Sequence, residues 1–172
     1  MTTIAASFAM LTMAADSRVT FYDNATDVST FSATCFKIWR TRKYIIGAAG
    51  MEDDISEFKR FILAPELKPW KRVTKKGEPF GAILLSRTGL FCVDDDSEIG
   101  RCKFPFHAIG SGAVCAMSSM NTMHRLGLDI DPELAVLVAI DHDNETGGPV
   151  DIERWKPIKR KEKINAQPVQ SV

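Results

Sequence analysis

The chain has 172 residues, of which 45% are hydrophobic and 26% charged, and this composition excludes wholesale disorder and suits one globular domain. Lysine plus arginine and aspartate plus glutamate both number 22, so the formal net charge is +0 and no basic field gathers nucleic acid. No apolar run reaches the length of a membrane span and no signal-peptide pattern opens the chain, so we expect a cytoplasmic protein with neither nucleic acid nor membrane as a partner.

The first half of the chain predicts strands followed by a helix. Short apolar runs predict two strands over 2–8 and 10–16, and the polar stretch 17–33 reads as turns. The segment 35–50, CFKIWRTRKYIIGAAG, predicts two strands around a charged turn. Residues 51–63 suit a helix, because acidic residues crowd its first turn and basic residues its last, as the helix dipole favours.

The middle of the chain predicts three more strands and a second helix. The segment 64–81 carries three prolines and a basic cluster, which indicates a long, solvated connection. Residues 82–94 predict two strands joined near Gly89, and 100–110 predict a third. A helix is expected from Ser111 up to Gly127.

The last third predicts a capped helix, a strand and a tail. Asp131 before Pro132 opens a helix whose leucine and valine face we expect in the core. Residues 147–155 predict a returning strand. We expect one domain over residues 2–157 and a flexible tail over 158–172. Strands in runs, followed by helices, indicate an α+β fold in which two antiparallel sheets stack between helical layers.

No metal or cofactor site is expected from the sequence. The four cysteines are widely spaced without a C-x-x-C pair, which favours free thiols: Cys35, Cys92, Cys102 and Cys115. The three histidines are isolated, and neither a Walker loop nor a dinucleotide fingerprint is present.

The N-terminal sequence MTTI suggests chemistry at the chain terminus. If Met1 is removed, Thr2 carries a hydroxyl and a free α-amine on one residue. Such an amine titrates at roughly 7.7–8.0 in model peptides, so part of it is neutral at cellular pH and can act as the base for the hydroxyl. This device also needs an anchored first strand, a cation, a carboxylate that orients the cation, and N–H donors for an oxyanion.

Five segments in order resemble the proteasome β-subunits and the HslV-type threonine peptidases. They are MTTI, AADSR, KIWRTRKYIIGAAG, AIGSG and DHDNETGG, and they cover the chain from residue 2 to about residue 152. The resemblance implies the four-layer αββα fold of N-terminal nucleophile hydrolases and a threonine-type endopeptidase subunit. It also implies protein or peptide substrates, a homo-oligomeric ring and an ATP-dependent unfoldase as a partner.

The resemblance also implies a role for each matching residue. Thr2 would be the nucleophile and base, Lys37 would lower the pKa of its amine, and Asp16 would hold Lys37. Gly50 would supply an oxyanion N–H. Three residues would form a supporting hydrogen-bond network: Ser111, Asp143 and Thr146. Three more would border an apolar substrate pocket: Ala48, Ala49 and Met51.

Several alternatives stay open at this stage. Thr2 could be an ordinary strand residue, Ser111 a helix N-cap, and Met51 competes with Gly50 for the oxyanion role. The chain could also be a non-catalytic ring or scaffold protein, or an amidohydrolase of small amides. The first hairpin is two residues shorter than is usual in this family, and the 64–80 connection stands where the family has a second long helix.

Overall fold

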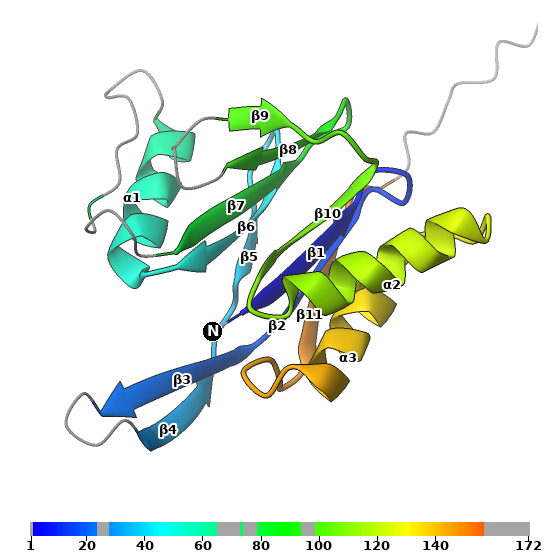
Figure 1. Ribbon diagram of the computed structural model, residues 1–172. Helices are drawn as coiled ribbons and strands as arrows, with labels where there is room; N and C mark the ends of the chain where they lie inside the picture. The colour runs from blue at the N-terminus through cyan, green and yellow to red at the C-terminus, as the bar shows by residue number, and fades with distance from the viewer. Residues whose placement is uncertain (1, 24–27, 65–72, 74–78, 94–98, 157–172) are drawn as a thin grey trace, which may run out of the picture.

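A computed structural model describes residues 2–23, 28–64, 73, 79–93 and 99–156, with the side chains of 19–34 excepted. The predicted C-terminal tail and most of the proline-bearing connection lie outside these residues. Figure 1 shows two sheets stacked between helices, with α1 on one outer face and α2 and α3 on the other. The predicted α+β fold with an αββα layer order is confirmed.

The first sheet has four antiparallel strands in the order β10-β1-β2-β11. Their bounds are β1 Thr3–Ser7, β2 Thr12–Asp16, β10 Phe106–Gly110 and β11 Val150–Arg154. The predicted first hairpin is confirmed as β1 and β2. Both faces of this hairpin are buried, because Ile4 and Met13 pack between the sheets whereas Ala5 and Ala14 lie under α2 and α3. A strand buried on both faces reads as a continuous apolar run, which explains the composition of this segment.

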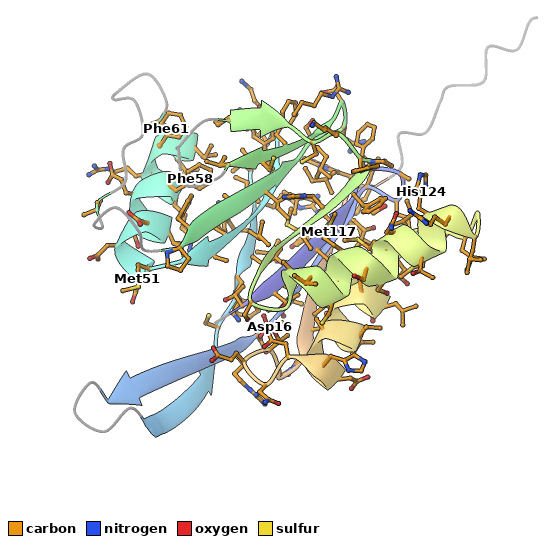
Figure 2. The ribbon with its side chains drawn as sticks, viewed as in Figure 1. Asp16, Met51, Phe58, Phe61, Met117 and His124 are labelled. Carbon is orange, nitrogen blue, oxygen red and sulfur yellow. The ribbon has the colours of Figure 1, made fainter. Side chains whose placement is uncertain are left out.

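The second sheet has five antiparallel strands in the order β5-β6-β7-β8-β9. Their bounds are β5 Ile38–Arg40, β6 Ile45–Gly50, β7 Phe80–Leu85, β8 Leu90–Val93 and β9 Ile99–Arg101. Helix α1 (Glu52–Leu63) covers the outer face of this sheet, where its buried Phe58 meets Phe80 edge to face at 5.7 Å. Figure 2 labels Phe58 on α1.

Helices α2 (Ala113–Arg125) and α3 (Pro132–His142) cover the first sheet. The Asp131 side chain caps α3 by accepting a hydrogen bond from Glu133 N–H, as predicted. The expectation that the leucine and valine face of α3 is core holds for Val136, which is fully buried, and is wrong for Leu134 and Leu137, which are 48% and 44% exposed. The small residues Ala135 and Ala139 are buried beside Val136, and they let the helix approach the sheet closely.

Two strand assignments are also corrected. The stretch 17–33, expected to be turns, contains most of an antiparallel ribbon of β3 (Arg18–Asp23) and β4 (Val28–Thr34). These segments are rich in β-branched and aromatic residues and satisfy each other's backbone groups, so they need no apolar alternation. The single strand expected over 100–110 is two strands in different sheets. Pro105 lacks an N–H, and the chain changes sheets between β9 and β10.

Candidate active site

Asp16, at the end of β2, is fully buried and binds three separate segments. Its Oδ1 accepts hydrogen bonds from Thr3 N–H at 2.7 Å and from Lys37 Nζ at 2.9 Å, and its Oδ2 accepts from Gly147 N–H at 3.1 Å. A buried carboxylate is tolerated only when it is paired and hydrogen-bonded. These contacts therefore join β1, the residue before β5 and the loop after α3 at one end of the sheets, where Figure 2 labels Asp16.

Lys37 is buried in the same place. Its side chain is 5% exposed, and Nζ also donates to the carbonyl oxygen of Arg18 at 2.5 Å. Lys37 directly precedes β5, whose Ile38 pairs with Gly47 of β6. A Cβ on Gly47 would lie 2.7 Å from Ile4 Cγ2, so this glycine lets the two sheets approach closely beside Lys37.

Thr2 is held through its main chain. Its carbonyl oxygen accepts a hydrogen bond from Ser111 N–H at 2.8 Å, and the Ser111 hydroxyl lies 3.5 Å from the same oxygen. A Cβ on Gly110, at φ +95°, would lie 1.7 Å from that oxygen, so only glycine fits there. The N-cap of α2 is Gly112, so the alternative that Ser111 caps this helix is wrong. Thr2 itself is half-buried and borders solvent.

Asp143 and Thr146 lie next to the start of β1. The Thr146 hydroxyl donates to Asp143 Oδ2 at 2.6 Å, and its oxygen lies 2.6 Å from Thr3 Oγ1. Burial alone would raise the pKa of Asp143. Hydrogen bonds from the hydroxyls of Thr146 and Ser111 and from Glu145 N–H outweigh burial and lower this pKa from its ordinary 3.8. Asp143 is therefore an ionised acceptor at neutral pH.

Gly50 ends β6 at the same end of the sheet as Lys37. Its φ is +141°, and an added Cβ would lie 2.8 Å from the carbonyl oxygen of Pro79. This conformation favours glycine strongly, so the residue type follows from the turn into α1. Its role as an oxyanion donor stays a prediction.

The three residues predicted for a substrate pocket differ in exposure. Ala48 is 2% exposed and packs between the second sheet and α1, and Ala49 is 8% exposed. Met51 is 50% exposed at the start of α1, where Figure 2 labels it. Of the three, Met51 therefore offers the largest apolar surface to a ligand.

Two residues that sequence reasoning missed belong to the same hydrogen-bond network. Thr3 is fully buried, and its hydroxyl oxygen accepts a hydrogen bond from Gly112 N–H at 3.1 Å. The signal for Thr3 was the pair of threonines after Met1, and the signal for Gly112 was the Gly-Ser-Gly sequence. Neither signal indicates that residues 109 positions apart are in contact.

The described part of the chain offers neither a metal cluster nor a membrane helix. No group of three or more His, Cys, Asp or Glu side chains there could hold a metal ion. Among the helices of the described residues, none is long and apolar enough to cross a membrane.

Comparison with known proteins relates this chain to others by fold. No protein-family profile and no curated protein sequence matches it. Among solved structures, HslV from Trypanosoma brucei aligns with a TM-score of 0.65 at 19% identity, over 88% of this chain and 97% of that one. The bacterial proteasome homologue BPH of Thiobacillus denitrificans aligns at 0.64 and 18% identity, over 91% and 98%. A BPH complex with epoxomicin aligns at 0.58 and 17%, over 90% and 100%. The chain thus has the fold of HslV and of this proteasome homologue.

Proposed function

We propose that this protein is a threonine-type endopeptidase subunit whose nucleophile is the hydroxyl of Thr2. The observation that carries the proposal is the buried Lys37–Asp16 ion pair, which is bonded directly to the N-terminal strand through Thr3 N–H. A buried ammonium group is costly, and a role in the chemistry of the adjacent terminus explains why the fold retains one here. The fold shared with HslV and BPH agrees with this reading.

The proposed reaction is peptide-bond hydrolysis in two steps. The Thr2 Oγ attacks the peptide carbonyl carbon, while the α-amine of Thr2 takes the hydroxyl proton and passes it to the leaving amine. An ester between Thr2 and the acyl half of the substrate remains, and water hydrolyses it with the same amine as base. The positive charge of Lys37 disfavours a second positive charge on that amine, so the amine stays available as a base.

The other predicted residues take supporting roles in this proposal. Gly50 N–H would stabilise the oxyanion of the tetrahedral intermediate. Asp16 orients Lys37, and the hydroxyls of Ser111 and Thr146 are themselves oriented by Asp143. The mechanism requires Thr2 to be the first residue of the mature chain, because an acylated nitrogen cannot accept a proton.

Assembly into a homo-oligomer is part of the proposal. Large apolar side chains gather on the outer surface of α2, α3 and the loop between them: Val114, Leu126, Leu128, Leu134 and Leu137, 76%, 68%, 58%, 48% and 44% exposed. An apolar surface of this kind on a single chain marks an interface. We propose that copies of this chain cover it in a ring, which an ATP-dependent unfoldase supplies with protein substrates. The cytoplasmic location stays a prediction.

The test combines labelling with an active-site inhibitor, determination of the N-terminal residue and measurement of the size of the assembly. Incubation with epoxomicin, the compound bound in the BPH structure, should add one inhibitor mass to Thr2. Thr2→Val, which keeps the branched shape, and Thr2→Ala should lose both label and peptide cleavage, whereas Thr2→Ser keeps the hydroxyl and should retain some of each. N-terminal determination should find threonine first.

Each outcome separates the alternatives. A labelled Thr2 in a large assembly supports the peptidase. A labelled monomer that cleaves small amides but not peptides would point to an amidohydrolase. A protein that takes no label and cleaves no peptide would favour a non-catalytic scaffold. Peptide cleavage by Thr2→Ala at the wild-type rate would contradict the role of Thr2 as the nucleophile.

A further inference from the structure

A continuous chain of hydrogen bonds passes through the buried hydroxyl of Thr3. Gly112 N–H donates to Thr3 Oγ1 at 3.1 Å, and Thr3 Oγ1 lies 2.6 Å from Thr146 Oγ1. Thr146 Oγ1 in turn donates to Asp143 Oδ2 at 2.6 Å. These hydrogen bonds therefore connect the start of α2, through β1, to the loop after α3.

The direction of every hydrogen bond in this chain follows from its two ends. Asp143 is ionised and can only accept, so the single hydroxyl proton of Thr146 is directed to Asp143. Thr146 then has only lone pairs for Thr3, and the Thr3 hydroxyl must be the donor between them. At the other end a backbone N–H can only donate, so Thr3 Oγ1 accepts from Gly112. The hydroxyl proton of Thr3 is thus donated to Thr146, and one lone pair of Thr3 Oγ1 accepts from Gly112 N–H.

The main chain of Thr3 is bound as firmly as its side chain. Its N–H donates to Asp16 Oδ1, the same oxygen that accepts from Lys37 Nζ. One fully buried residue thus connects both carboxylates of the candidate site, Asp16 through its backbone and Asp143 through Thr146. The close packing is specific, since a Cβ on Gly112 would lie 2.2 Å from Thr3 Oγ1.

We propose that Thr3 is a positioning residue of the proposed peptidase. Its hydroxyl accepts a hydrogen bond from Gly112 N–H and donates one to Thr146 Oγ1, and these two bonds hold the adjacent Thr2 in its reactive orientation. This inference rests on the proposed function. Thr3 has no part in bond making, because its side chain is buried and its proton is already donated. Its effect is on geometry, and a misplacement of about 1 Å at a reacting group can lower the rate about 100-fold.

The experiment compares Thr3→Val and Thr3→Ser with the control Thr12→Val. Thr12 is also a buried threonine of the first hairpin, and its hydroxyl donates to Met10 O at the opposite end. We expect Thr3→Val to lower kcat by about 10- to 100-fold with KM nearly unchanged. Thr3→Ser keeps the hydroxyl and should restore most of kcat, and Thr12→Val should keep the wild-type kcat.

A second readout does not depend on activity. Gly112 N–H loses its acceptor in Thr3→Val, so its amide hydrogen should exchange with solvent faster than in wild type, and Thr12→Val should leave it unchanged. If Thr3→Val does not fold, Thr3→Ala removes the same hydroxyl without placing a methyl group there. Equal kcat in Thr3→Val and wild type would overturn the positioning role, as would unchanged Gly112 exchange. If wild type neither cleaves peptides nor takes the label, the proposed function fails, and the exchange data alone still decide whether the hydrogen-bond chain exists.

Discussion

Breaking the Asp16–Lys37 ion pair should destabilise the protein strongly. The two charged atoms lie 2.9 Å apart, with side chains 0% and 5% exposed. At an effective dielectric constant of about 20, this distance corresponds to roughly 6 kcal/mol of Coulomb attraction, which opposes the cost of desolvating both charges. Removing one partner of such a pair leaves the other charge buried, at a cost of about 3–5 kcal/mol. For a chain of this length that lowers Tm by roughly 6–20 °C.

The double-mutant cycle of Asp16→Asn and Lys37→Met isolates the pair. Asparagine keeps the volume of Asp16, and methionine keeps most of the length of the lysine side chain. The double variant leaves no buried charge behind, so its loss of unfolding free energy should be smaller than the summed single losses by about 2–3 kcal/mol. All three variants should lose Thr2 labelling. Lys37→Met and the double variant lack the ammonium group, and in Asp16→Asn the carboxylate that holds this group is gone.

Urea unfolding followed by circular dichroism, at one protein concentration, measures the free energies. If the two single losses add to within about 0.5 kcal/mol of the double, the ion pair does not form in the folded protein and the reasoning is refuted. If the double variant keeps its label, Lys37 has no part in activating Thr2.

Three further predictions follow from single positions. Gly50→Ala forces a side chain into φ +141° and should lower the unfolding free energy by about 1–3 kcal/mol. Gly100→Ala, which meets nothing within 4 Å, is its matched control in the same unfolding assay. Burial raises the pKa of the Cys102 thiol to about 12, so iodoacetamide at pH 8 should alkylate the exposed Cys35 long before Cys102, as read by peptide mass spectrometry. Burial lowers the pKa of His107 below 6.5, so its stabilising contribution is present above pH 6.5 and is lost as pH falls through the lowered value. His107→Asn should therefore flatten the fall of Tm between pH 7 and pH 5.

The results that would contradict these predictions are direct. Equal stabilities of the two glycine variants would mean that the positive φ is not adopted. Alkylation of both thiols at one rate would place Cys102 at the surface. An unchanged pH dependence of Tm in His107→Asn would mean that this histidine is not buried in its neutral form.

Local patterns were sufficient for the elements whose signals lie within a few residues. The first hairpin, helix α1 with its acidic first turn and the Asp131 cap of α3 were all predicted from neighbouring residues. The ribbon of β3 and β4 was missed because two strands that pair mainly with each other need no apolar stripe. The exposed Leu134 was misplaced because hydrophobicity alone does not distinguish a core face from an interface.

For the site, amino-acid order supplied the candidates, and the fold supplied their contacts. Thr2, Asp16 and Lys37 could be singled out from segments that resemble a known family, and glycine patterns marked the turns. That Thr3 joins Thr146 to Gly112 is a matter of tertiary structure, since 109 and 143 residues separate these partners from Thr3 along the chain. Hydrogen bonds act over about 3 Å, and nothing in the spacing of residues along a chain encodes which distant loops come within that distance.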